Sequence, residues 1–162
     1  MTIFEVPGVA IAHWEADVQC VRIEWLSFVN SSGFKEVMKR GVAECAARKA
    51  VGWIADTRNT KGMLSVDDQQ FLVNYMPITR ASGLRTIVTI RPRTGILTEM
   101  SNRRWQKNVA DPTWSLVEVE SLEEARAYCR KVKDAVAHGS LVSDACRTTG
   151  GPSVSCRDEQ LG

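Results

Sequence analysis

The sequence predicts an α/β domain in which an N-terminal antiparallel strand pair is followed by alternating helices and strands. A short apolar run at residues 51–57 leads into a polar, glycine-bearing loop, as expected of a buried strand whose carboxyl end opens at the surface. The segments before and after this strand carry apolar residues at helical spacing. Together these observations predict a mixed sheet that is covered mainly by helices.

The first third of the chain supplies the strand pair and a helix. Residues 8–13 and 18–29 are rich in β-branched and aromatic side chains and are joined by a polar connection, which predicts two antiparallel strands. Polar residues and Gly33 end this pattern, and the apolar spacing that follows predicts a helix over residues 34–49. Gly41 lies on the apolar stripe of that helix and indicates close packing against the sheet.

After the central strand, a second helix is predicted to begin at Ser65. Its hydroxyl can accept from the first free amides, and Asp68 places an acid at the third helical position. Pro77 removes an amide donor, so a kink or a break is expected before the helix ends at residues 81–83. The remaining pattern predicts a strand at residues 84–90, a less regular helix at 96–111, a strand at 114–119 and a helix at 121–136.

Length and composition are those of one soluble globular domain. The chain has 162 residues, of which 44% are hydrophobic and 25% charged, with a formal net charge of +2. Residues 1–138 are predicted to form the domain and residues 139–162 a Gly/Ser/Thr-rich C-terminal tail. The N-terminus lacks the pattern of a secretory signal, and no apolar run reaches the roughly 18 residues of a membrane span, so a cytoplasmic protein is expected.

Cysteines and histidines indicate no metal or cofactor. The five cysteines form no Cys-x-x-Cys pair, and Cys45 and Cys129 fall on apolar helix faces as small buried side chains. The two histidines, His13 and His138, lack ligand spacing. Nucleophile elbows and glycine-rich phosphate or dinucleotide loops are missing as well, which makes an enzyme the less favoured hypothesis.

Three stretches carry a resemblance to a known fold. They are the strand at residues 53–58, the helix start at 64–69 and the Ser-Leu-Glu-Glu-Ala-Arg-Ala segment at 121–127. With this element order, the region of about residues 8–136 resembles the STAS domains, which include bacterial anti-sigma-factor antagonists, and is most similar to small stand-alone proteins of that fold. The resemblance implies a cytosolic protein without catalysis of its own, which binds a partner through the region around the second helix.

The resemblance also gives Ser65 two possible roles. In the antagonists, a serine at this helix start is phosphorylated to break the partner complex, and Ser65 occupies the similar position. Phosphate there would add about two negative charges at a helix N-terminus. The alternative is that Ser65 is simply the N-cap of the helix.

Asp56 and the basic residues permit other interpretations. Asp56 at a strand end also suggests the phosphoacceptor of a receiver domain, but the acidic pair that would hold magnesium is missing after the first strand, so a structural role is favoured. The candidate anion-binding residues are Arg58, Lys61, Arg91, Arg93, Arg103 and Arg104. On one face they would suit a phosphate, a carboxylate or an acidic partner, whereas the alternative is a solvated face with ordinary ion pairs. Binding of nucleic acid is not favoured.

The leading hypothesis is a non-enzymatic regulatory or protein-interaction domain of STAS-like type. Its partner is another protein or a second copy in a homodimer, and the candidate contact surface is formed by Leu64, Val66, Asp67 and Tyr75. The alternative is a carrier or sensor that holds a small apolar or anionic ligand between the sheet and the helices.

Overall fold

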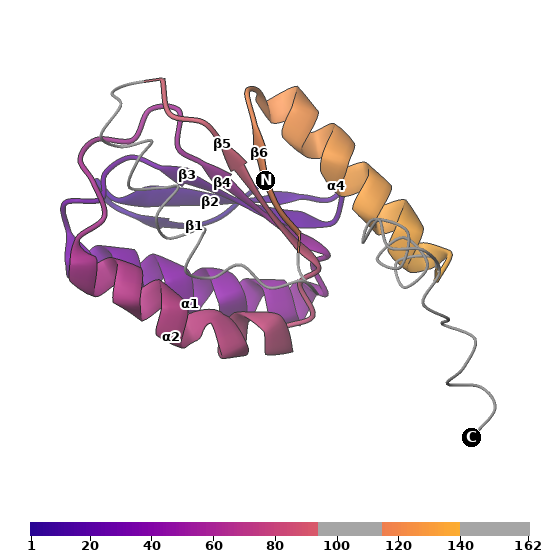
Figure 1. Cartoon of the computed structure of the whole chain (residues 1–162), viewed down its shortest axis with the longest axis horizontal. Helices are drawn as coiled ribbons and strands as arrows, with labels where there is room; N and C mark the ends of the chain where they lie inside the picture. Colours follow the sequence, from indigo (N-terminus) through magenta and orange to yellow (C-terminus); the bar gives the residue numbers. More distant parts are fainter. Residues whose placement is uncertain (94–114, 140–162) are drawn as a thin grey trace, which may run out of the picture.

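The computed structural model describes residues 1–93 and 115–139, which contain a six-stranded mixed sheet (Figure 1). The strands are β1 (Thr2–Val6), β2 (Ala10–Glu15), β3 (Cys20–Trp25), β4 (Gly52–Asp56), β5 (Thr86–Ile90) and β6 (Ser115–Val119). The β1–β2 and β2–β3 pairs are antiparallel, and the pairs from β3 to β6 are parallel. The predicted α/β class, the N-terminal antiparallel pair and the mixed sheet are thereby confirmed.

Every strand of this sheet lies beside the strand that precedes it in the chain. The order is β1-β2-β3-β4-β5-β6. Each new strand is therefore added at the same edge of the described sheet, and the strand order never reverses. Open α/β sheets often bind ligands where the strand order reverses, because the connections there diverge to opposite faces. This sheet does not form such a crevice after β4, and a binding site has to be sought on one of its faces.

Within residues 1–93 and 115–139, three helices cover the sheet, two on one face and one on the other (Figure 1). Helices α1 (Ser31–Arg48) and α2 (Val66–Ala81) lie side by side on one face, and α4 (Leu122–Ala137) packs on the opposite face over β4, β5 and β6. Successive crossovers of one hand that advance in one direction place their helices on the same face, as seen for α1 and α2. Among these described helices, none has the length and apolar character needed to cross a membrane.

Successive side chains along the strands point alternately into two hydrophobic cores, one on each face of the sheet. Under α1 and α2, the larger core contains Val21, Ile23, Trp25, Phe34, Val37, Val42, Trp53 and Ile87. Under α4, the smaller core contains Val18, Cys20, Ile54, Val88, Ile90, Ala125, Cys129 and Val132. Since β4 and β5 are buried on both faces, they appear in the sequence as nearly continuous apolar runs.

Gly41 allows α1 to approach the sheet closely, as predicted. A Cβ atom at this position would lie 2.6 Å from Cη2 of Trp53, which is too near for any side chain. Because Gly41 has no side chain, the six-membered ring of Trp53 can pack directly against the backbone of α1.

The structure corrects several predicted boundaries. β1 was missed by the sequence analysis, and β3 ends at Trp25 rather than extending to residue 29. Pro77 does not break α2, which continues to Ala81. The predicted helix at residues 96–111 and the predicted tail from residue 140 onward lie outside the described residues.

Three cysteines are buried free thiols, which confirms the prediction for Cys45 and Cys129. Burial raises the pKa of the Cys45 thiol to about 12. The neighbouring Cys129 thiol and burial raise the pKa of Cys20. Cys20 and Cys45 therefore remain protonated near neutral pH, and all three cysteines pack as small apolar side chains.

Candidate functional site

Asp56 at the end of β4 is held by two arginines. Its Oδ1 accepts from Nε of Arg58 at 2.9 Å, and its Oδ2 accepts from Nη2 of Arg58 at 2.7 Å and from Nη1 of Arg22 at 3.5 Å. Burial alone would raise the pKa of Asp56, but the hydrogen bonds from Arg58 outweigh burial and hold this pKa below its usual value. Asp56 therefore stays ionised and has the structural role that the sequence favoured.

The network of Asp56 extends across the sheet face that α4 leaves open. Glu15 accepts from Nε of Arg22 at 2.7 Å and from Nη2 of Arg126 at 2.8 Å, which ties β2 to α4. Burial would raise the pKa of Glu15, yet these two arginines lower it. Nε2 of His13 lies 3.1 Å from a carboxylate oxygen of Glu24. Asp56 and Glu15 are both paired with arginines, so both carboxylates stay ionised near neutral pH and the network braces the sheet.

The candidate anion-binding residues do not form one free basic cluster. Arg58 is paired with Asp56, and Arg91 is paired with Glu118 at 3.3 Å and with Glu120 at 2.8 Å. The amide of Arg93 donates to the carbonyl of Arg58 at 3.2 Å, which brings the backbones of these two residues together, while Lys61 is exposed on the loop before α2. Arg103 and Arg104 lie outside the described residues. Arg58 and Arg91 thus match the ordinary ion pairs that the sequence left as the alternative, whereas anion binding by Lys61 and Arg93 stays a prediction.

Ser65 caps α2 as the sequence predicted. Its side-chain oxygen accepts from the amide of Asp68 at 3.1 Å, and its backbone is extended. The carboxylate of Asp68 does not turn back to complete a capping box. Instead Oδ1 of Asp68 accepts from the hydroxyl of Ser31 at 2.5 Å, which joins the first turns of α1 and α2. The start of α2 is therefore fixed in place by α1 as well as by its own cap.

Replacing Ser65 with alanine should lower the free energy of unfolding by about 0.5–2 kcal/mol, because the amide of Asp68 loses its acceptor. Urea denaturation measures this loss. Ser65→Asp is the matched control, since aspartate keeps an oxygen at the cap and should preserve stability. Equal losses in both variants would contradict a capping role for Ser65.

The predicted contact surface is exposed at some of its positions and buried at others. Asp67 is exposed, and Tyr75 is half-buried with its ring stacked on Phe71 at 5.2 Å. Leu64 was expected on this surface, but it is only 5% exposed and belongs to the core. The reason is its place directly before the N-cap, where the chain turns the side chain under α2.

Two apolar residues missed by the sequence analysis extend this surface. The exposed fractions are 78% for Val29, 48% for Met63 and 75% for Val66. A Cβ atom at Gly62 would lie 2.9 Å from Cγ2 of Val29, so Val29 lies against the loop that carries Met63. We call Val29, Met63 and Val66 the apolar rim. Val29 directly precedes the N-cap Asn30, a position whose side chain often packs inward, and this signal pointed away from the surface.

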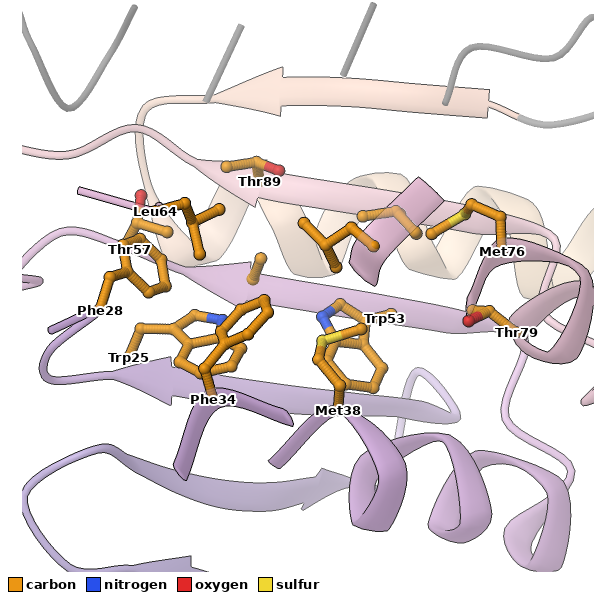
Figure 2. A pocket seen from close by; sticks show the side chains of 13 residues that line it. Trp25, Phe28, Phe34, Met38, Trp53, Thr57, Leu64, Met76, Thr79 and Thr89 are labelled. Carbon is orange, nitrogen blue, oxygen red and sulfur yellow. The ribbon is translucent and has the colours of Figure 1, made fainter. Parts of the chain in front are cut away.

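A pocket lies between the sheet and helices α1 and α2 (Figure 2). Its volume is about 40 Å³, and the described lining consists of Trp25, Phe28, Phe34, Met38, Trp53, Ala55, Thr57, Leu64, Leu72, Met76, Thr79, Ile87 and Thr89. These residues come from α1, α2, three strands and two loops. The lining is almost wholly apolar, and none of these side chains is ionisable.

Two indole N–H groups are the polar groups that stand out in this lining. Figure 2 shows the nitrogens of Trp25 and Trp53 turned toward the middle of the pocket from opposite sides. The two residues are only 3% and 4% exposed, and within the described part of the chain neither indole N–H has a hydrogen-bond partner. In contrast, the hydroxyl groups of Thr57 and Thr79 donate to backbone carbonyls, at 2.6 and 3.1 Å.

No protein-family model, curated protein or solved structure matches this chain. The features of the described residues that point to a function are the apolar rim beside Ser65 and the pocket that Leu64 lines. Within the described residues, no group of three or more acidic, histidine or cysteine side chains is arranged to hold a metal ion.

Proposed function

We propose that the chain is a regulatory or protein-interaction domain of STAS-like type, which binds a partner through the apolar rim and the start of α2. The observation that supports this most is the exposure of Val29, Met63 and Val66 around the N-cap Ser65. Single exposed apolar residues are common, but neighbouring ones around one helix start favour a contact surface. The partner is another protein or a second copy of the chain.

The regulatory part of the proposal concerns Ser65. Its exposed side chain lies between Met63 and Val66 in the sequence, within the proposed contact surface. A phosphoryl group on Ser65 would place about two negative charges among these apolar side chains, next to the exposed carboxylate of Asp67. The charge would favour the helix N-terminus while weakening contact with an apolar or acidic partner.

Val66→Asp should weaken the partner complex at least tenfold, or about 1.4 kcal/mol, because a charge enters the centre of the contact. Val66 is the first residue of α2, where aspartate suits the helix, so the fold should remain intact. Native mass spectrometry of the gently purified full chain measures the complexed fraction, its stoichiometry and any phosphoryl group on Ser65.

Ile78→Asp is the matched control for this experiment. Ile78 lies on the same helix and is also exposed, but it is distant from the apolar rim. The complex should survive Ile78→Asp. If both variants reduce it equally, or if the wild-type chain carries no partner and forms no dimer, the proposed contact surface is wrong.

The pocket favours a second candidate function, that of a carrier or sensor of a small ligand. Its apolar lining and its position between sheet and helices are typical of small-molecule sites. The same mass spectrum tests it, because a retained molecule appears as added mass on the unmodified subunit. Of the two ligand classes predicted from the sequence, the lining favours an apolar ligand over an anionic one, because it supplies no positive charge to pair with an anion.

A further inference from the structure

The pocket remains unfilled because the strand residues beneath it, on β4 and β5, have short side chains. Ala55 lies on β4 between Trp53 and Thr57, and Thr89 pairs with it on β5. Longer residues at these positions would fill the space under α2, as protein cores normally do. The remaining volume of about 40 Å³ exceeds the roughly 10–15 Å³ that one water molecule requires.

The pocket provides hydrogen-bond donors without a partner. The indole N–H groups of Trp25 and Trp53 face the space, whereas the hydroxyl hydrogens of Thr57 and Thr79 are already used. The fully buried side-chain atoms without a hydrogen-bond partner in the described residues are Oδ2 of Asp68 and Nε of Arg91, so the two indole nitrogens are not sealed in the core but reach the pocket space. The six-membered ring of Trp53 is seated against Gly41, which fixes the position of its indole ring.

We propose that this pocket binds a small, uncharged, largely apolar molecule that carries a hydrogen-bond acceptor such as a carbonyl oxygen. The acceptor receives the indole N–H of Trp25 or Trp53 or both, and the aromatic walls enclose the apolar part. A charged ligand would lose its hydration without gaining a counter-charge, since no described lining residue is ionisable. This inference rests on the proposed carrier or sensor function and adds to it the chemical class of the ligand.

Two methionines give the pocket room to adapt to such a ligand. Met38 on α1 lies beside Trp53, and Met76 on α2 lies near Thr79 at one end of the pocket (Figure 2). Methionine side chains are unbranched and change rotamer readily, so they yield to a ligand more easily than the aromatic walls do. The free space of about 40 Å³ is smaller than a six-membered carbon ring, so a ligand of that size binds only if Met38 and Met76 move away.

The test is a titration of the ¹⁵N-labelled full chain with cyclohexanone, followed by NMR of the indole N–H signals. The signals of Trp25 and Trp53, assigned from Trp→Phe variants, should move downfield and saturate with one Kd. Trp14, whose half-buried ring lies outside the pocket and faces Arg48, should not respond. Methylenecyclohexane has the same shape without the carbonyl oxygen and should not produce the downfield shift.

Ala55→Val provides the blocking variant, because two added methyl groups on the floor occupy the space. It should raise the Kd for cyclohexanone at least tenfold and leave the Trp14 signal in place. The proposal is overturned if no signal saturates, if both probes give the same shift, or if Ala55→Val binds normally. A retained molecule in the mass spectrum together with no response to cyclohexanone would overturn the ligand class alone and leave the carrier function standing.

Discussion

Phe34→Ala should lower the free energy of unfolding by about 3–5 kcal/mol, the usual range for removing a buried aromatic ring. The ring is fully buried in the larger core. Its centroid lies 5.2 Å from the ring centroid of Trp25, 6.1 Å from that of Phe28 and 6.4 Å from that of Phe71. The aromatic neighbours are too large to collapse into the space, so most of the cavity should persist. Urea denaturation followed by far-UV circular dichroism measures the loss.

Phe71→Ala is the control for this prediction. Phe71 belongs to the same row of rings but is only partly buried, and its other neighbour is the half-buried Tyr75. Its removal should cost clearly less, since less apolar area returns to water. A loss below about 1 kcal/mol for Phe34→Ala would show that the ring does not hold the core together.

Asp56→Ala should destabilise the fold by about 3 kcal/mol, because it leaves the partly buried guanidinium groups of Arg22 and Arg58 without a shared carboxylate. This is the lower end of the range for broken buried pairs, since part of Arg58 remains in solvent. Urea denaturation at neutral pH measures it. Asp56→Asn keeps the shape and part of the hydrogen bonding and separates the loss of charge from the loss of contacts.

The stability of the protein should also fall in acid because of Asp56 and Glu15. Both have a lower pKa in the folded state than their ordinary values of 3.8 and 4.5, so their contribution is complete above those values. The contribution is lost as the pH falls below them and through the lower pKa values of the folded state. Asp56→Asn should flatten the pH dependence of the unfolding free energy below about pH 4. If Asp56→Asn leaves the pH dependence of the unfolding free energy unchanged in acid, the arginine pairs do not have the stabilising role given to them here.

The fold was largely predictable because local signals mark its elements. Ser65 and Ser121 cap their helices as predicted, each accepting from the amide three residues later. β1 was missed although Thr2–Val6 is rich in β-branched and aromatic residues and is followed by the turn signal Pro7-Gly8, so the sequence did carry a signal for this short strand. Pro77 was expected to kink or break α2, but the helix continues through it to Ala81, because burial of Leu72 and Met76 holds the helix on the sheet despite the missing amide donor.

The candidate site was less predictable than the fold. Ser65 and Val66 follow from the helix start, but the inward turn of Leu64 depends on packing beneath α2. The pocket is assembled from residues far apart in sequence, and its space results from Ala55 lying opposite helices rather than from any motif. Alternation did offer one unused signal, because His13 and Glu15, like Arg22 and Glu24, point to one polar sheet face.

The unbroken strand order has a consequence for how the chain folds. Each strand needs only the strand before it as a template, so the sheet can grow in the order in which the ribosome delivers it. Each parallel pairing still has to close a connection of about 30 residues, as between Cys20 and Gly52, so these pairings form more slowly than the β1–β2 and β2–β3 hairpins. The contacts of α4 with the segment around β2 span 111 residues for Arg126 and Glu15 and 116 for Lys133 and Asp17, so they form only after α4 has been made.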